Sequence, residues 1–517
     1  MANKTVFASM RGRMVPQATA RNAEGAPAYA YSDAHQLAQL AVTGTVGQLF
    51  YASPEAELRT AVRLAETVPA AFLAKAAVYA RREGHMKDMP AVLLAVLARR
   101  DPVLFRKAFG HVVDNGKMLR TFVQIVRSGR TGRKSLGTRP KAMVAGWLNE
   151  ASDWAILQAN IGNDPSLADV IRMVHPKPVS AEREALFAWI VGRPCDVTLL
   201  PNPVQDWLAF KAEGHGEVPD VPFQMLTQLP LGQRQWTRIA QRGAWHMVRM
   251  NLNTFLRHGV FDRPSVVREV AAKLRDPDRI AKARVFPYQL LVAAKAASAE
   301  LPGEIRDALH DAMETSVQNV PKLAGEVVVC PDVSGSMDWP VTGYRKGASS
   351  AVRFVDVAAL VAAAVLRRNP SATVLPFDYG VHDVRLEPRD TIQTNATRLA
   401  AYGGGGTNCA APLAWLADRR RAPDLVVLVS DNQSWLQAGM GRVTKVMEEW
   451  TRLKRLNKAA KLVCIDIAPY GTTQAVERED VLNVGGFSDA VFERIADFAT
   501  GRMGPAHWVG EIEKVRL

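Results

Sequence analysis

From about residue 325 onward the sequence alternates short apolar runs with helix-like segments, and this alternation constrains the fold more than any other feature. The expected strands are apolar on both faces, which is typical of a parallel sheet covered by helices. We expect strands at 326–332, 372–377, 381–386, 424–430 and 461–467, and helices at 353–368, 411–416, 443–456 and 490–499. The segment 325–500 is therefore predicted to form one doubly wound α/β domain, in which ligands bind at the carboxyl ends of the strands.

The preceding part of the chain, from residue 30 to 320, has a different pattern. Apolar residues recur at intervals of three and four, with Gly, Pro and Asp between the periodic segments and without strong strand signals. We expect helices at 56–64, 70–82, 91–97, 120–126 and 141–148. Helix after short helix predicts an all-α array, a solenoid of HEAT-like helix pairs, although the sequence has no clean repeat period.

Oxygen-bearing side chains follow the expected strands of the α/β domain. Asp332-Val-Ser-Gly-Ser336 follows the first strand, Thr407 follows the glycine run 403–406, and Asp431 follows the strand that ends at Ser430. Two carboxylates and three hydroxyls form a hard, all-oxygen set suited to Mg²⁺, or alternatively Mn²⁺, with one coordination position open for a carboxylate or phosphate oxygen. The ordered set resembles the metal-ion-dependent adhesion site of von Willebrand factor A domains. The expected metal ligands are Asp332, Ser334, Ser336, Thr407 and Asp431.

The positive charge of the chain is concentrated in its helical part. The formal net charge is +14; residues 321–517 hold 24 basic and 22 acidic side chains, which leaves a net +12 for the first 320 residues. A polyanionic partner for the helical part is the favoured interpretation. The alternative is a mildly basic surface without a special role.

Two acid-free stretches carry much of this charge. The segment 115–149 holds eight basic residues, and its part 129–135 is loop-like but lacks the glycine that a phosphate-binding Walker loop needs before Lys134. Flexible basic side chains on such loops bind backbone phosphates. The segment 231–261 interleaves arginines with Trp236 and Trp245, which suits single-stranded RNA unless both tryptophans belong to the core. His175 ends an expected helix, and as a lone histidine it is more typical of a helix cap than of a ligand.

Other features exclude several classes of protein. The four cysteines lie far apart without a CxxC pair, which excludes a zinc ribbon and favours a reducing compartment. Apolar runs are too short to span a bilayer, and residues 1–25 lack the apolar core of a signal peptide. We therefore expect a cytoplasmic protein without a membrane partner. No pattern typical of a nucleophile and its base is present, so the chain is not expected to be an enzyme.

A basic all-α array followed by a von Willebrand factor A domain resembles the Ro autoantigen family, which combines a TROVE domain with a von Willebrand factor A domain, and in particular its bacterial members. The resemblance covers residues 30–500. It is carried by the blocks 40–44 with Phe50-Tyr51, 80–84 leading to Pro90-Ala91, 141–150, 169–178, 283–287 and 481–487. The expected organisation is a tail at 1–25, a TROVE-like RNA-binding domain at 26–322, a von Willebrand factor A domain at 323–505 and a tail at 506–517.

This resemblance implies a specific function. The helical repeats would close into a ring sealed by the von Willebrand factor A domain. Structured small RNAs (Y or Y-like RNAs) would bind its outer basic surface, and single-stranded 3′ ends of misfolded or decaying RNA would enter its positively charged hole. The Y-RNA surface maps by position onto Arg139, Lys141, Arg172 and His175. An exoribonuclease such as polynucleotide phosphorylase is an implied partner.

We therefore expect a non-catalytic RNA-binding ring protein that acts in RNA quality control and the stress response. The RNA-binding residues expected from both basic stretches and the resemblance are Lys117, Arg120, Arg127, Arg130, Arg133, Lys134, Arg139, Lys141, Arg172, His175, Arg249 and Arg257. One alternative is an adhesion-type module that uses Mg²⁺ to capture a partner's carboxylate. A second is a metal-dependent nuclease, for which Asp338 and His382 are the available second-metal or general-base candidates.

Overall fold

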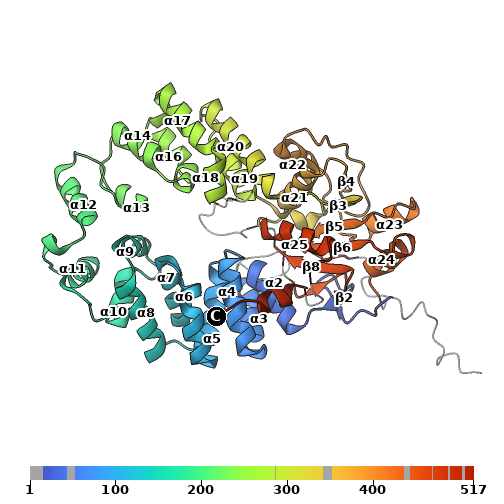
Figure 1. Cartoon of the computed structure of the whole chain (residues 1–517), viewed down its shortest axis with the longest axis horizontal. Helices are drawn as coiled ribbons and strands as arrows, with labels where there is room; N and C mark the ends of the chain where they lie inside the picture. The colour runs from blue at the N-terminus through green and yellow to red at the C-terminus, as the bar shows by residue number, and fades with distance from the viewer. Residues whose placement is uncertain are drawn as a thin grey trace, which may run out of the picture. The chain divides into compact units, whose positions relative to one another are not determined.

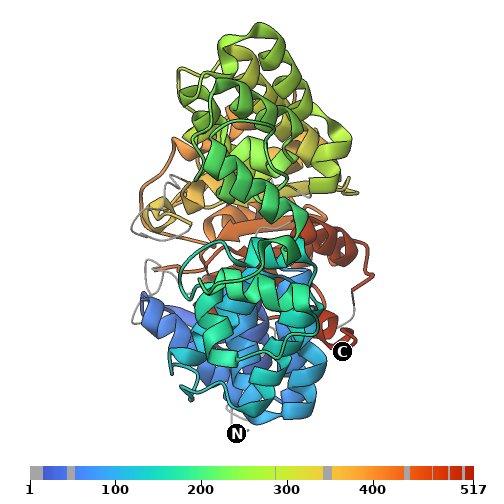
Figure 2. The ribbon, with the colours of Figure 1, turned by 90° about the vertical axis from the view of Figure 1, so that its left-hand side faces the viewer.

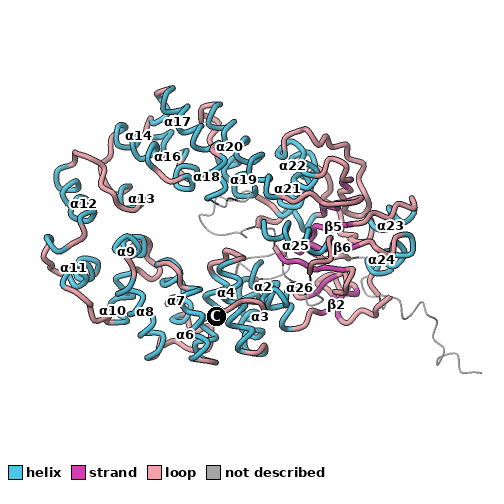
Figure 3. Tube along the Cα trace, in the orientation of Figure 1, coloured by secondary structure: helices cyan, strands magenta, loops and turns pink. Residues whose placement is uncertain are grey.

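The computed structural model describes residues 15–517, except 44–52, 284, 286, 342–351, 436–442, 469, 487–488 and 504–506. The chain divides into two compact units, which are described separately below. The sheet unit comprises residues 1–60, 284–296 and 310–514, and the helical unit comprises 61–283, 297–309 and 515–517. Figure 3 shows that, in the part of the chain described, strands occur at the N-terminal end and after residue 325.

Most of the described residues between the N-terminal strands and residue 320 are helical, as predicted (Figures 1 and 2). In chain order they begin with α2 (Asp33–Thr43), α3 (Pro54–Thr67), α4 (Ala70–Arg82), α5 (Asp88–Arg100), α6 (Pro102–Val112), α7 (Gly116–Arg127), α8 (Thr138–Glu150), α9 (Asp153–Ala159), α10 (Leu167–Val174), α11 (Ala181–Ile190) and α12 (Asn202–Glu213). They are followed by α13 (Phe223–Leu226), α14 (Gln233–Arg242), α15 (Trp245–Met250), α16 (Leu252–Arg257), α17 (Pro264–Arg275), α18 (Pro277–Ala283), α19 (Pro287–Ala296) and α20 (Gly303–Ser316).

Neighbouring helices of the helical unit pack against each other in chain order, which is the packing of a solenoid. Helix α5 is buried from Met89 to Ala98 because it lies against α4, α6 and α7. Asp101 begins α6: its carboxylate accepts hydrogen bonds from the amides of Val103 and Leu104. Short capped helices with apolar inner faces thus make a layered core, in agreement with the expected all-α solenoid.

The sheet unit contains a five-stranded parallel sheet in the order β4-β3-β5-β6-β8. Its strands are β3 (Val327–Pro331), β4 (Thr373–Val374), β5 (Leu425–Ser430), β6 (Lys461–Asp466) and β8 (Val481–Gly485). Its helices are α21 (Phe354–Arg368), α22 (Ile392–Ala400), α23 (Ala411–Asp418), α24 (Lys445–Leu456), α25 (Asp489–Ala499) and α26 (His507–Glu513). Helices α21, α22 and α25 lie on one side of the sheet, and α23 and α24 on the other (Figure 1). The predicted doubly wound α/β domain is therefore confirmed.

An N-terminal hairpin also belongs to the sheet unit. Strands β1 (Ala20–Arg21) and β2 (Pro27–Ala30) pair antiparallel, and β2 pairs with β7 (Thr472–Thr473). The side-chain amide of Asn22 donates to the carbonyl oxygen of Ser434 over 2.6 Å. The hairpin thus lies against the loop that follows β5.

Several expected elements differ from the structure. The prediction of a strand at 381–386 is wrong. Val381 makes only an isolated bridge to Phe377, because charged residues alternate with the apolar ones after it and no continuous apolar strand forms. The strand predicted at 372–377 is reduced to β4, although Phe377 still bridges to Asp332. Helix α22 and the short hairpin strands were not predicted, since their apolar patterns are too short or too mixed to stand out.

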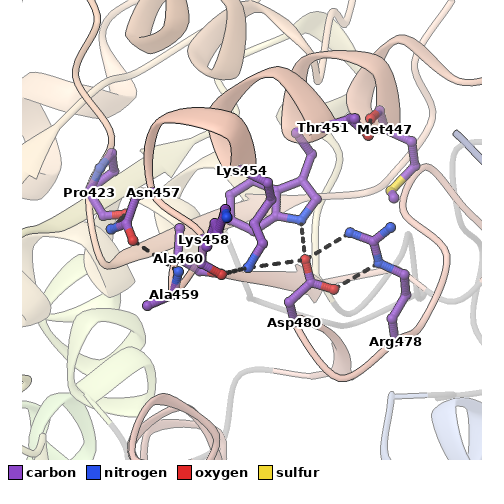
Figure 4. A network of polar contacts seen from close by, with 11 residues as sticks. Pro423, Met447, Thr451, Lys454, Asn457, Lys458, Ala459, Ala460, Arg478 and Asp480 are labelled. Atoms are coloured by element: carbon purple, nitrogen blue, oxygen red, sulfur yellow. Dashed lines mark hydrogen bonds and ion pairs between the residues drawn. The ribbon is translucent and has the colours of Figure 1, made fainter. Parts of the chain in front are cut away.

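A buried tryptophan ties α24 to the turn before β8. The indole Nε1–H of Trp450, which is fully buried, donates to Asp480 Oδ2 over 2.9 Å. Arg478 donates two hydrogen bonds of 2.7 Å to the same carboxylate, and Lys454 lies 3.6 Å from it (Figure 4). Burial alone would raise the pKa of Asp480. The hydrogen bonds and the charge of Arg478 outweigh this effect and hold the pKa of Asp480 below its ordinary value.

Replacing this carboxylate is expected to destabilise the sheet unit. Asp480→Ala leaves the Trp450 indole without its acceptor and should lower the free energy of unfolding by about 1–3 kcal/mol near neutral pH, measured by urea unfolding. Because the native pKa of Asp480 is depressed, its contribution is present above the unfolded pKa and disappears as the pH falls through the native pKa. The difference between wild type and variant should therefore shrink in acid. Asp418→Ala, which removes an exposed partner of Arg452 on α24, is the matched control and should change stability little. Equal stability of wild type and Asp480→Ala would contradict this account.

None of the helices among the described residues combines the length and the apolar character that a bilayer crossing needs.

Candidate metal site and basic helical surface

The carboxyl ends of three neighbouring strands place acidic residues at one edge of the sheet. Asp332 directly follows β3 and Asp431 directly follows β5, while Asp466 is the last residue of β6. The register pairs Pro331 with Val429 and Ser430 with Asp466, so Asp332 and Asp466 lie level with Ser430 and Asp431 lies one residue beyond. Asp466 was not among the expected ligands, although the signal was the same: an apolar strand that ends in an aspartate.

The five predicted ligands gather at this edge, and all of them are buried. The hydroxyl of Thr407 donates to Ser334 Oγ over 2.8 Å, and Ser334 Oγ lies 3.4 Å from Ser336 Oγ. Asp332 accepts hydrogen bonds from the Ser334 amide at 2.9 Å and from the Ser430 hydroxyl at 2.5 Å. Hydroxyl and carboxylate oxygens from three loops therefore meet in one buried cluster.

The glycine run before Thr407 allows this close approach. The amide of Gly404 donates to Val333 O over 2.9 Å, and the amide of Gly335 donates to Gly405 O over 2.8 Å. Gly403 has φ +91°, and a Cβ atom there would lie 1.9 Å from Val333 O. Only glycine fits at this position, because the two loops contact each other through their backbones.

Burial raises the pKa values of the carboxyls at this edge. The pKa of Asp332 rises to about 7, mainly through burial and partly through the negative charge of Asp431. Burial also raises the pKa of Asp431, and that of Asp466 well above its ordinary value. Asp431 Oδ2 is buried and accepts no hydrogen bond from any of the residues described. A buried carboxylate oxygen without a donor, beside three hydroxyls, fits a hard divalent cation.

The composition of the cluster limits which metals suit it. In the part of the chain that the structure describes, no group of three or more His, Cys, Asp or Glu side chains is placed to hold a metal ion. The edge offers hydroxyls with two close carboxylates instead, which suits Mg²⁺ or Mn²⁺ better than zinc. Asp338 and His382, the candidates for a nuclease mechanism, pair with Arg353 at 2.8 Å and with Asp378 at 2.9 Å.

The first basic stretch forms an exposed surface on the helical unit. Residues 128–137 are a loop between α7 and α8, as expected, and α8 begins beside Arg139 and Lys141. The guanidinium of Arg127 donates to Lys134 O over 3.2 Å and so braces the loop. Exposed cations that pair with no carboxylate among the described residues are Arg130, Lys134, Arg139 and Lys141.

The second basic stretch is largely structural. Trp236 and Trp245 are buried: the ring of Trp236 stacks on His258 at 4.3 Å, and the indole of Trp245 donates to Leu274 O over 3.2 Å. The hypothesis that these tryptophans stack on RNA bases is therefore wrong, since they belong to the core of the helical unit. Arg249 lies over the ring of Trp245 at 5.7 Å, and Arg257 donates to the Thr254 hydroxyl over 3.2 Å.

One cavity nevertheless joins the two basic stretches. It encloses about 1060 Å³ within the helical unit, between α7, α9, the loop 218–222, α13 and α14. Lys117 and Arg120 of the first stretch line it together with Arg238 and Arg242 of the second. Trp154, with 42% of its surface exposed, adds an aromatic wall. Trp154, Arg238 and Arg242 were absent from the expected RNA-binding set, because no signal in the sequence indicates that these segments meet.

The four cations of this cavity differ in their availability. Arg120 donates to the carbonyl oxygens of Ile161 and Pro165, and Arg238 pairs with Glu217 at 2.7 Å. Lys117 and Arg242 are exposed and pair with no carboxylate among the residues described. These two are therefore the side chains in the cavity that are available to an anionic ligand.

Comparison with known proteins supports both the α/β domain and the helical part of the chain. Residues 326–499 match the Ro60 vWA domain family, and residues 233–302 match the TROVE domain family. The chain is thus similar to Ro proteins in both its helical part and its α/β part. It is 25% identical, over 93% of its length and 96% of the other protein, to the RNA-binding protein RO60 of Deinococcus radiodurans. The crystal structure of the Deinococcus radiodurans RO (RSR) protein matches with a TM-score of 0.60 at 22% identity, covering 91% of this chain and all of the other. The expected resemblance to Ro proteins is thus confirmed, as is the fold of a helical solenoid with a von Willebrand factor A domain.

The Ro-like residues at the end of α10 lie on the surface. His175 is exposed and ends α10 with φ 50°, the left-handed conformation of a helix cap. Arg172 is exposed and donates to Val191 O over 2.7 Å. Some residues of the blocks that carry the Ro resemblance lie outside the described residues, namely Gly44, Phe50, Tyr51, Arg284, Phe286 and Phe487.

Proposed function

We propose that this Ro-like chain binds RNA through its helical unit and does not itself catalyse a reaction. The observation that carries this proposal is the cavity in which two acid-free stretches, more than a hundred residues apart in sequence, present Lys117 and Arg242 beside Trp154. Cations with an exposed aromatic ring suit the phosphates and unstacked bases of single-stranded RNA. The name of the Deinococcus relative, an RNA-binding protein, supports the same activity.

The resemblance to the Ro family also supports a more specific proposal about which RNAs bind and where. The exposed cations of the 128–141 surface, with Arg172 and His175, would hold a small structured RNA such as a Y-like RNA. Single-stranded 3′ ends would enter the central hole of a ring formed by the helical repeats. A cytoplasmic role in RNA quality control, alongside an exoribonuclease such as polynucleotide phosphorylase, completes the proposal.

Filter binding of two RNAs by the full chain tests whether it binds both structured RNA and single-stranded 3′ ends. One probe is a blunt stem-loop, and the other is the same stem-loop with a single-stranded 3′ tail. We expect both to bind, and the tailed RNA to bind more tightly. Arg139→Glu combined with Lys141→Glu should weaken the blunt probe. Failure of the full chain to retain either RNA would contradict the proposal.

We further propose that Asp332, Ser334, Ser336, Thr407 and Asp431 hold a divalent cation, Mg²⁺ or Mn²⁺. The carboxylates of Asp332 and Asp431 would hold the ion directly or through water, and the hydroxyls would fill further positions. When bound, the cation would supply an electrophilic position for one further oxygen ligand. The support is the donor set itself, together with the orphaned Oδ2 of Asp431.

Metal binding is expected to stabilise the protein by mass action. Mg²⁺ at about 100 times its dissociation constant should raise the free energy of unfolding by about 2.7 kcal/mol, measured by urea unfolding with and without EDTA. Asp431→Asn should abolish this increase because it removes the orphaned carboxylate charge. Asp378→Asn, a buried aspartate paired with His382, is the matched control and should keep it. Stability that does not respond to Mg²⁺ or Mn²⁺ would contradict the metal site.

A further inference from the structure

One lysine of the helical unit is buried against carbonyl oxygens rather than against a carboxylate. Lys273, on α17, is 8% exposed. Its Nζ donates to Ala240 O and to Gly243 O over 3.1 Å each, and also to Gln241 O. Burial holds the pKa of Lys273 below its ordinary value, and the charge of Arg279 lowers it further. A buried ammonium group is costly unless its protons are accepted, and here three carbonyl oxygens accept them.

These carbonyls belong to the C-terminal end of α14. The last turn of a helix has carbonyl oxygens that no amide of the same helix satisfies, and their partial negative charge attracts a cation. Ala240 and Gln241 are in this last turn, and Gly243 directly follows it. Lys273 therefore satisfies the end of α14 from a neighbouring helix.

The residue after Lys273 contacts the beginning of the next helix. Leu274 O accepts a hydrogen bond from the indole of Trp245, the first residue of α15, over 3.2 Å. One turn earlier on α17, Glu269 accepts from the side-chain amide of Gln241 over 2.6 Å. We call residues 242–245 the helix joint. Its conformation is thus fixed by α17 on both sides, at the end of α14 and at the start of α15.

The helix joint forms part of the wall of the basic cavity. Arg242, Gly243 and Ala244 line this cavity, whereas Lys273 does not. Arg242 is exposed and has no carboxylate partner in the described part of the chain, so the direction of its side chain depends on the backbone of the joint. Because all three protons of the Lys273 ammonium group are bound by carbonyl oxygens, this lysine can act on a ligand only through the joint.

We propose that Lys273 is a positioning residue for RNA binding: it fixes the helix joint so that Arg242 can contact a phosphate of RNA in the cavity. The inference rests on the proposed RNA-binding function of the cavity. It adds a buried residue that does not contact RNA to those on which RNA affinity depends.

A double-mutant cycle between Lys273 and Arg242 tests this role, with filter binding of single-stranded oligouridine to the full chain. Arg242→Ala should lower RNA affinity about fourfold near 0.15 M salt and should make the slope of log affinity against log salt concentration shallower by about 0.7, as expected for one phosphate contact. Lys273→Met should cause the same two changes. The double variant should lose about fourfold rather than about sixteenfold, because Arg242 contributes only while the joint is fixed.

Arg100→Met is the matched control. Arg100 also donates to backbone carbonyls at the end of a helix, those of Ala65 at 2.6 Å and Val68 at 2.8 Å, but α3 does not line the cavity. This variant removes one positive charge, as Lys273→Met does. It should lower the free energy of unfolding and leave the salt slope of RNA binding unchanged. RNA affinities are compared at a temperature at which urea unfolding shows every variant to be fully folded.

A second variant loosens the joint from its other side. Trp245→Phe removes only the indole N–H that Leu274 O accepts, and it replaces Lys273→Met in the cycle if that variant does not fold. Its loss of RNA affinity should likewise disappear when Arg242 is already alanine.

The outcomes separate this inference from the function on which it rests. Losses that multiply in the cycle would overturn the positioning role, as would RNA binding that depends on Arg242 but is unchanged when the joint is loosened. Wild type that binds no oligouridine would contradict the proposed function itself, and the inference with it.

Discussion

Reversing the charges of Lys117 and Arg242 together is expected to lower the affinity of the full chain for single-stranded RNA by at least about 100-fold near physiological salt. Both side chains line the cavity of the helical unit, and neither pairs with a carboxylate among the residues described. Glutamates at these positions remove two phosphate contacts and add repulsion. The slope of log affinity against log salt concentration should also become shallower, by about 0.7 for each lost contact.

The net charge of the chain changes equally in a matched control. Arg385→Glu combined with Lys458→Glu alters two exposed cations of the sheet unit, outside the helical array. This control should bind RNA nearly as wild type does. Equal losses in both double variants would show that bulk charge, rather than the cavity, determines affinity. Retained affinity in Lys117→Glu/Arg242→Glu would remove the cavity from the RNA-binding surface.

Gly403→Ala is expected to have the largest effect on the sheet unit. The substitution forces a side chain into a positive φ and places its Cβ atom 1.9 Å from Val333 O, so the two site loops must separate. We expect a loss of about 2–5 kcal/mol in the free energy of unfolding. Metal affinity should fall at least about 100-fold, because Thr407 moves away from Ser334, to which it donates over 2.8 Å.

Substitution of the neighbouring Gly404 distinguishes the cost of backbone strain from the cost of a steric clash. Gly404 has φ +97°, but a Cβ atom there would meet nothing within 4 Å. Gly404→Ala should therefore cost only the strain, about 1–2 kcal/mol, and should largely keep metal binding. The two variants are compared by urea unfolding and by calorimetric titration with Mn²⁺. Equal metal affinities in Gly403→Ala and wild type would show that contact between the loops does not shape the site.

The gathering of Asp332 and Asp431 at one edge of the sheet could be predicted from the sequence because its signals are local. Parallel pairing brings strand ends to one edge, so an aspartate after each apolar run is enough to place Asp332 and Asp431 together. The same rule applied to the run 461–467 would have included Asp466. The prediction of a strand at 381–386 was wrong because that segment has apolar residues but does not pair continuously with a neighbouring strand.

The basic cavity and the burial of individual tryptophans could not be predicted in the same way. Lys117 and Arg242 meet only through the packing of α7 and α9 near α13 and α14, and no spacing along the chain encodes that contact. Composition does not separate Trp236, which is buried, from Trp435, which is exposed. Burial of an aromatic residue depends on neighbours that are distant in sequence, and only the folded structure shows them.

We propose that the helical unit binds RNA mainly through phosphate contacts. The most direct test is to measure the affinity of the full chain for a single-stranded RNA across a range of salt concentrations. We predict a linear decrease of log affinity with log salt concentration, with a slope that corresponds to several phosphate contacts at about 0.7 each. A flat dependence on salt, or no binding of RNA even at low salt, would contradict the account.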